Sequence, residues 1–189
     1  MIVLNEQEII NGCIDKNAVC QRLLFDKYAG SLLSICRRYA RDPSGAEDML
    51  QETFIKIFSN IHQYQFAGSF EGWIKKITVN YCLKYLKKKR IEFKDSTVTE
   101  AELNSSIGPE ILSSLSEEEL MKMISNLPDG YRVVFNLYVI EGYDHNEIAG
   151  MLDIKATTSR SQLIKARRSL QKQVLLNQNS ASYDDRKRV

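Results

Sequence analysis

The sequence predicts an all-α protein made of two small helical domains that are joined by a flexible acidic linker. Apolar residues recur at three- and four-residue spacings along most of the chain, and alternating strand patterns are scarce. The 189 residues suit one large domain or two small ones, and 43% hydrophobic residues suffice for packed cores. The net charge of +2 divides into +4 over residues 1–95, −6 over 96–130 and +4 over 131–189. This layout predicts two anion-binding modules with an acidic segment between them.

Composition argues against several classes of protein. No apolar run approaches the roughly 20 residues of a membrane span, and the first residues lack a basic leader, so neither stable membrane insertion nor a signal peptide is expected. The four cysteines form no C-x-x-C motif, and neither histidine lies near one in sequence. We therefore expect unpaired thiols in the cytoplasm, with no metal and no cofactor.

Three helices are predicted in the first half of the chain. The first covers about residues 23–39, and Ser44 with Glu47 three residues later has the pattern of a capping box that starts the second. Two glycines and three aromatic residues interrupt the pattern over residues 63–72, before a third helix over residues 73–90. The expected core positions of the second helix are Ala46, Leu50, Ile57 and Ile61.

The second half begins after residues 96–115, which lose the apolar periodicity and form the predicted linker. The second domain is expected over residues 116–177, and the polar tail 178–189 is expected to be disordered. Asp144 and Glu147 give a second capping box. Helices are predicted from about Glu117, over residues 131–141 up to Gly142, over 144–152, and over 157–176 after a turn at 153–156.

The last two predicted helices form a helix–turn–helix. Their buried stripes are Ile148, Ala149 and Leu152 in the first and Leu163, Ala166 and Leu170 in the second. Residues 154–183 hold six cations and no acid, which suits a polyanion. A helix held on a short support can enter the major groove of DNA, although an ordinary bundle would show the same spacings. The face opposite the core carries Arg160, Ser161, Ile164, Lys165 and Arg168.

A second basic region lies at residues 73–90, which hold seven cations and no acid. Trp73, Lys76, Asn80 and Lys84 recur on one face of this helix, and the aromatic loop before it could stack an extruded base. The alternative is that Trp73 and the two preceding phenylalanines, Phe66 and Phe70, simply fill the core.

The second predicted helix, which precedes this basic region, presents a polar face with Asp48, Gln51, Glu52 and Ile55. Paired carboxylates could bind a metal or act as acid and base, but no histidine, cysteine or third carboxylate completes such a site. The apolar Ile55 among polar groups favours a surface for a protein partner.

Taken together, these segments resemble an extracytoplasmic-function (ECF) sigma factor, the smallest class of bacterial RNA polymerase sigma subunits. Residues 46–54 (AEDMLQETF) resemble the family's polymerase-binding helix, and residues 70–80 (FEGWIKKITVN) the start of its promoter-melting helix. Residues 147–149 (EIA), with 158–163 (TSRSQL) and 165–167 (KAR), resemble its carboxy-terminal helix–turn–helix. The resemblance covers about residues 5–173, and the three segments have the family's order and spacing.

The resemblance implies a role for each domain and no catalysis by the chain itself. Residues 1–95 would be sigma region 2, which binds the clamp coiled coil of the polymerase largest subunit and melts the minus-ten element. Residues 116–177 would be region 4, which reads the minus-thirty-five element beside the polymerase flap. The implied polymerase contacts are Asp48, Gln51, Glu52, Phe54, Ile55 and Phe58. The implied minus-ten contacts are Phe66, Ser69, Phe70, Trp73, Lys76, Asn80 and Lys84. The implied minus-thirty-five contacts are Thr158, Ser159, Arg160, Ser161, Gln162, Ile164, Lys165 and Arg168.

Three positions depart from the family's usual residues. Asp153 and Thr157 stand where glycine is usual, and Ser159 stands where an apolar residue is usual. Aspartate tolerates the left-handed backbone of a tight turn better than most residues, so we expect the motif to survive. The start of the reading helix and its base contacts are expected to differ from those of relatives.

Two other functions fit parts of the sequence. A stand-alone helix–turn–helix regulator would leave the basic helix and the Asp48 face unexplained. A helical nuclease would use Glu47, Asp48 and Glu52, but the remaining acids cluster in the linker. The charge layout also predicts regulation, either by closure of the two basic modules on the acidic linker or by an anti-sigma partner.

Overall fold

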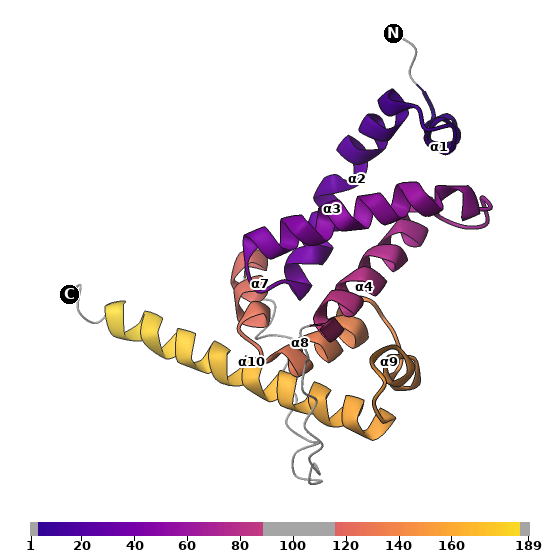
Figure 1. The fold of residues 1–189 in the computed structure, drawn as a ribbon. Coiled ribbons are helices and arrows are strands. Elements are labelled where there is room, and N and C mark those ends of the chain that lie inside the picture. Colours follow the sequence, from indigo (N-terminus) through magenta and orange to yellow (C-terminus); the bar gives the residue numbers. More distant parts are fainter. Residues whose placement is uncertain (1–3, 89–115, 186–189) are drawn as a thin grey trace. The chain divides into compact units, whose positions relative to one another are not determined.

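The computed structural model describes residues 4–88 and 116–185, and for 177–185 it describes the backbone alone. Every regular element in these ranges is helical, as the sequence predicts (Figure 1). The chain divides into two compact units, Met1–Lys89 and Arg90–Val189, which we describe separately. The predicted linker at 96–115 lies outside the described residues. No helix in the described ranges is long and apolar enough to cross a membrane.

Unit 1 is built around three long helices, α2 (Ala18–Tyr39), α3 (Pro43–Asn60) and α4 (Phe70–Lys88), which pack pairwise (Figure 1). A single 3-10 turn, η1 (Ile61–Gln63), follows α3. All four predicted core positions of α3 are buried, so the prediction of its inner face is confirmed. The four cysteines are free and buried in this unit.

Two helix starts in unit 1 differ from the prediction. The N-cap of α3 is Asp42, whose carboxylate accepts a hydrogen bond from the Gly45 amide at 2.7 Å, and Pro43 takes the first helical position. Aspartate before proline is a strong start signal, and it outcompetes the Ser44 capping box that we predicted. Helix α2 begins earlier than expected, because the Asn17 side chain accepts from the amides of Val19 and Cys20.

The sequence pattern did not predict α1 (Glu6–Ile14), which packs on α2. Only Ile10 and Cys13 of this helix are buried, so its inner face offers too few apolar positions for a periodic pattern to stand out. Its docking depends on Glu6, whose carboxylate accepts hydrogen bonds from the Lys27 ammonium and the Tyr28 hydroxyl. These bonds lower the pKa of Glu6.

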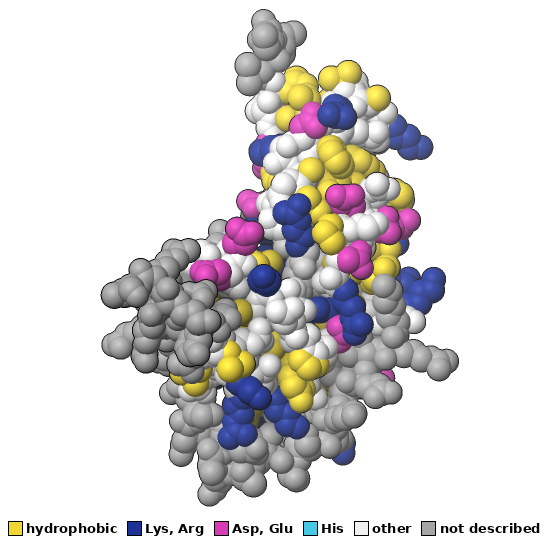
Figure 2. Space-filling model, turned by 90° about the vertical axis from the view of Figure 1, so that its left-hand side faces the viewer, with side chains coloured by type: hydrophobic (Ala, Val, Ile, Leu, Met, Phe, Trp, Pro, Cys, Tyr) yellow, Lys and Arg dark blue, Asp and Glu magenta, His cyan; other side chains and the backbone are white. Residues whose placement is uncertain are grey.

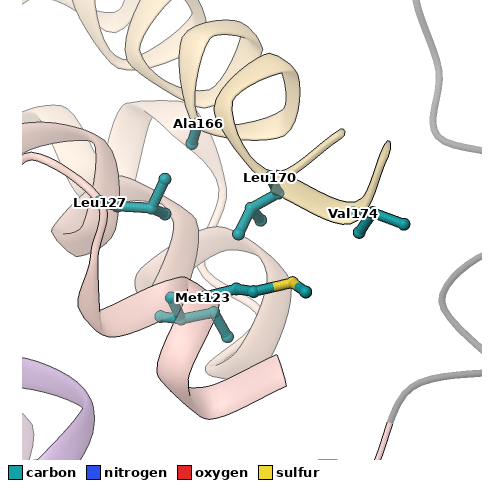
Figure 3. Packing of buried hydrophobic residues seen from close by; sticks show 6 residues of the cluster. Met123, Leu127, Ala166, Leu170 and Val174 are labelled. Carbon is teal, nitrogen blue, oxygen red and sulfur yellow. The ribbon is translucent and has the colours of Figure 1, made fainter. Parts of the chain in front are cut away.

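Unit 2 packs three short helices against one long one. The short helices are α7 (Glu117–Ser125), α8 (Asp129–Phe135) and α9 (His145–Leu152), and the long one is α10 (Ala156–Asp185) (Figure 1). Side chains of the α7 segment and of α10 meet in its core (Figure 3). The core cluster comprises Met123, Ile124, Leu127, Ala166, Leu170 and Val174.

Two elements of unit 2 differ in extent from the prediction. The single helix expected at 131–141 is α8 followed by a π-helical turn, η2 (Asn136–Ile140), and Gly142 ends it at φ +80°. Helix α10 continues to Asp185, beyond the expected end at 176 and into the tail that we predicted to be disordered. Residues 171–185 contain neither glycine nor proline, so no residue in that stretch terminates the helix.

The core of unit 2 yields a stability prediction with a matched control in the same helix. Leu170 is 1% exposed, whereas Leu175 is 49% exposed. We expect Leu170→Ala to lower the free energy of unfolding of unit 2 by about 2–5 kcal/mol, because it leaves a cavity against α7. Leu175→Ala should change it by less than about 0.5 kcal/mol. Hydrogen exchange of α7 and α10 peptides in urea measures both, and equal effects of the two substitutions would contradict this packing.

Candidate functional site

The outer face of α3 combines acidic and apolar side chains. Asp48, Gln51, Glu52 and Ile55 are all exposed, and Ile55 has 57% of its surface accessible. Acidic side chains beside exposed hydrophobic ones are visible in the upper half of Figure 2. These four positions are three to four residues apart, which keeps them on one side of the helix. The structure therefore places these four side chains on one exposed face of α3, as the sequence predicts.

Phe54 does not belong to this face. It is 3% exposed, and its ring packs 4.6 Å from Phe25 of α2 and 5.8 Å from Phe58, measured between centroids. The resemblance implies a polymerase contact for Phe54, whereas the structure places its ring on the flank of α3 that packs on α2. Phe58 is half-buried and lies at the border of the exposed face.

The other flank of α3 faces α4. The Lys56 ammonium lies 5.6 Å from the centre of the Tyr81 ring, in a cation–π contact. Burial, followed by the negative charges of Glu52 and Asp48, raises the pKa of Tyr81. The acidic face of α3 is thus close enough to α4 to influence its side chains.

The segment between α3 and α4 is organised around Tyr64. Its ring lies within 5.5 Å of three others, those of Phe66, Phe70 and Trp73. Its hydroxyl donates a hydrogen bond to the Gly68 carbonyl at 2.7 Å, which closes the loop on itself. Sequence reasoning noted Tyr64 among the loop's aromatic residues but assigned it no role. The close sequence spacing of Tyr64, Phe66, Phe70 and Trp73 is the signal that could have predicted this aromatic cluster.

The aromatic residues of this loop divide into supporting and exposed ones. Phe70, an implied minus-ten contact, is 2% exposed and its ring packs 5.8 Å from that of Tyr28, so it fills the core as in the alternative given above. Trp73 is half-buried and stacks on Phe70 at 5.7 Å. Phe66 is 43% exposed and has a left-handed backbone at φ +55°. That conformation is unusual for a bulky residue, and it holds an aromatic ring in solvent.

Helix α4 continues from this loop as a basic face. Ser69 caps the helix, because its hydroxyl accepts from the Gly72 amide at 3.3 Å and its carbonyl accepts from the Trp73 amide at 3.1 Å. Lys76, Asn80 and Lys84 are exposed one turn apart, as predicted. Aromatic and basic groups therefore follow one another along one edge of unit 1.

The helix–turn–helix of unit 2 forms as predicted. The Asp144 carboxylate accepts from the amides of Asn146 and Glu147, and the Glu147 side chain accepts from the Asp144 amide. Asp153 ends α9 in the left-handed region, at φ +59° and ψ +50°. The predicted inner residues of both helices are buried, apart from Ala149, which is half-buried. An aspartate thus adopts the left-handed conformation of the turn, as we expect from its tolerance of that region.

The expected reading face of α10 is only partly exposed. Arg160 is exposed, and Ile164, Lys165 and Arg168 are half-buried. The other four expected contacts, Thr158, Ser159, Ser161 and Gln162, are buried. Ser159 and Gln162 lie one turn before Leu163 and Ala166, so they extend the core stripe. The Ser161 hydroxyl donates to the Thr158 carbonyl at 2.9 Å.

A contact that the sequence did not predict joins three elements of unit 2. The His145 ring stacks on Tyr138 with centroids 4.4 Å apart and planes 19° from parallel. Its Nδ1 lies 2.9 Å from the Ser159 hydroxyl oxygen. Burial, followed by the positive charge of Arg160, lowers the pKa of His145. Residues 7 and 14 positions away make these contacts, and a periodic pattern does not reveal such pairings.

The described residues hold no group of three or more histidine, cysteine, aspartate or glutamate side chains that could bind a metal ion.

Comparison with known proteins identifies both units. Residues 24–91 match the family described as Sigma-70 region 2, and residues 117–170 match Sigma-70, region 4. The ECF RNA polymerase sigma-E factor of Escherichia coli K12 is 30% identical over 164 residues, which are 80% of this chain and 85% of that protein. The ECF RNA polymerase sigma factor SigE of Mycolicibacterium smegmatis is 28% identical over 160 residues, and the match spans 58% of its length.

A solved structure shares the fold. It is the sigma factor RpoE of Bartonella quintana in complex with the anti-sigma factor NepR, with a TM-score of 0.50. Sequence identity is 20%, and the match covers 82% of this chain and 95% of that one.

The turn at Asp153 yields a prediction about stability. Glycine adopts the left-handed backbone without steric cost, so we expect Asp153→Gly to stabilise unit 2 by about 0.5 kcal/mol. Asp153→Ala should destabilise it by about 1 kcal/mol, because alanine gains no compensating polar contact there. The measurement is the free energy of unfolding from hydrogen exchange of α9 and α10 peptides. An alanine variant as stable as the glycine variant would show that the turn is not strained.

Proposed function

Since this chain belongs to the ECF family of RNA polymerase sigma factors, we propose that its two units divide promoter recognition between them. The chain is a sigma factor that directs promoter-specific initiation of transcription. Unit 1 binds core polymerase and opens the minus-ten element, and unit 2 reads the minus-thirty-five element. The observation that carries this division is that unit 1 presents both an acidic face on α3 and a basic, aromatic face on α4.

The polymerase contact is the exposed face of α3. Asp48 and Glu52 supply charge, Gln51 supplies hydrogen bonds, and Ile55 supplies exposed apolar surface. A polar rim around an apolar centre is typical of a protein interface, and the acids require a basic partner. The partner that fits is the clamp coiled coil of the polymerase largest subunit. Phe58 extends the contact, while Phe54 supports it from below by packing on Phe25.

The minus-ten contact is the loop before α4 together with the basic face of α4. Extruding a base costs a few kcal/mol, and stacking on an aromatic ring returns about 1–3 kcal/mol per base. Phe66 offers the exposed ring, and Tyr64 and Trp73 hold the surface behind it. Lys76 and Lys84 then track the phosphates of the separated strand, and Asn80 between them can bond a base edge.

The minus-thirty-five contact is the exposed side of α10, beside the polymerase flap. Arg160 is an exposed cation in the first turns of this helix, and an arginine can bond two acceptors of one guanine in the major groove. Lys165 and Arg168 supply phosphate contacts, and Ile164 supplies apolar contact. Ser159 and Gln162 support the helix from its buried side, while Thr158 and Ser161 shape its first turn.

The polymerase, and not this chain, catalyses RNA synthesis in the proposed assembly, which acts in the cytoplasm. An anti-sigma factor is a further proposed partner, because the solved Bartonella sigma factor is in complex with one. The stand-alone regulator remains the competing function. Tight, specific binding to duplex promoter DNA without polymerase would favour that function over the proposed one.

The polymerase contact predicts a charge-specific loss of affinity. We expect the double substitution Asp48→Ala with Glu52→Ala to weaken binding of core RNA polymerase by about 10- to 100-fold, since each truncated interface charge costs about 1 kcal/mol or more. Glu118→Ala removes an exposed acid of unit 2 and serves as the control, with an expected change below about twofold. Fluorescence anisotropy of labelled protein measures the affinities. An equal loss in the control would mean that the effect reflects net charge and not this face.

The loop predicts a defect in promoter opening. Phe66→Ala should reduce the fraction of open complexes by about tenfold, because the extruded base loses its stacking partner. Phe66→Tyr keeps an aromatic ring and should retain most of the opening. The reactivity of minus-ten thymines toward permanganate measures opening in the polymerase complex. If the alanine variant opens promoters as well as the tyrosine variant, the ring does not stack a base.

A further inference from the structure

We propose that His145 is a positioning residue for promoter reading, which sets the start of α10, and with it Arg160, through its contacts with Tyr138 and Ser159. The inference rests on the proposed role of α10 and deepens it. It assigns an influence on sequence selectivity to a contact between side chains that are not themselves proposed to bind a base.

The three side chains connect the two helices of the helix–turn–helix with the turn η2 that precedes them. Tyr138 belongs to the π-helical turn η2, His145 begins α9, and Ser159 lies in the first turn of α10. The stacked rings are 4.4 Å apart, and the hydrogen-bonded atoms Nδ1 and Oγ are 2.9 Å apart. A single imidazole thus spans from the support helix to the reading helix. π-helical turns of this kind often occur at functional positions.

Because Ser159 and His145 are removed from solvent to different degrees, loss of their contact has an energetic cost. Ser159 is fully buried, so a hydroxyl left without its imidazole partner would carry a desolvation cost. His145 is half-buried, and Arg160 and Arg167 place positive charge near it, opposed by the carboxylate of Asp144. Burial first, and then the two arginines, lower the pKa of His145 and so favour the neutral imidazole, which can hydrogen-bond the hydroxyl without adding a further positive charge beside Arg160.

The position of Ser159 is coupled directly to that of the reading residues. Neighbouring residues of an α-helix differ by about 100° in direction and 1.5 Å in height, so Arg160 moves with any rotation or slide at Ser159. Bidentate hydrogen bonds to a base tolerate only small displacements. A change in this buried contact is therefore expected to change which base is preferred, and not only how tightly DNA is held.

Two substitutions of His145 separate its two contacts. His145→Phe keeps a ring on Tyr138 but removes the nitrogen that meets Ser159. His145→Asn keeps a hydrogen-bonding group near the Nδ1 position and removes the ring. Ser159→Ala removes the hydroxyl from the other side. Ser169→Ala makes the same chemical change ten residues further along α10 and serves as the matched control.

The experiment uses the full chain with core RNA polymerase and a promoter library that is randomised in the upstream element. Transcripts are sequenced to give the base preference at each position, and hydrogen exchange of α9 and α10 confirms that each variant is folded at the assay temperature. We expect His145→Phe and Ser159→Ala to reduce discrimination at one or two positions by about tenfold. Because both remove the same bond, the double variant should lose no more than either single one. His145→Asn should retain part of the discrimination, and Ser169→Ala all of it.

The outcomes separate this inference from the proposed function. If the folded variants keep the parental base preference, or lose transcription equally from all sequences, His145 has no positioning role and the inference is overturned. If the parental protein itself shows no upstream preference, the proposed role of α10 fails first, and the inference fails with it. A shifted base preference, with the hydrogen-exchange protection of α9 and α10 unchanged, supports the positioning role.

Discussion

The packing of α3 between α2 and α4 is the contact on which the organisation of unit 1 depends. Met49 and Ile57, fully buried on its inner side, anchor the helix, and Phe54 and Lys56 lie on opposite flanks. Once these sides are occupied, the direction of the remaining face is fixed. Because a helix of 18 residues spans about 27 Å, that face is long enough to meet a partner helix over several turns. The proposed polymerase-binding surface is thus the face of α3 that remains exposed after α3 has packed against α2 and α4.

In unit 2 a single helix combines two roles. Helix α10 supplies core side chains and is also the proposed reading helix, with Leu170 facing α7 and Arg160 exposed near its start. The core cluster holds the middle of the helix, while α9 and the His145 contact hold its beginning. The core cluster and the proposed reading residue Arg160 therefore occupy different segments of one helix.

Periodicity in the sequence predicts the helices and their inner faces well, because burial repeats every three to four residues. It predicts the exposed acids of α3 and the exposed Lys76 and Lys84 of α4 for the same reason. It does not decide the orientation of Phe54 and Phe70, to which the resemblance assigns contacts, since an aromatic side chain on a flank can turn to the core or to solvent depending on its neighbours. It also fails for His145 and Ser159, whose pairing depends on the angle between two helices. The family resemblance names the role of a segment, whereas the structure decides which side chains of the segment are free to perform it.

The distribution of thiols has a practical consequence for labelling. All four cysteines lie between residues 13 and 82, and all are buried in unit 1. Burial raises the pKa of Cys13 to about 11, so its reactive thiolate is scarce at neutral pH. A cysteine introduced on the exposed side of α10 would therefore be more accessible to reagents than any of the four buried thiols. The native protein is in this respect a ready background for attaching a fluorophore or spin probe to its second unit, with no need to remove the native cysteines first.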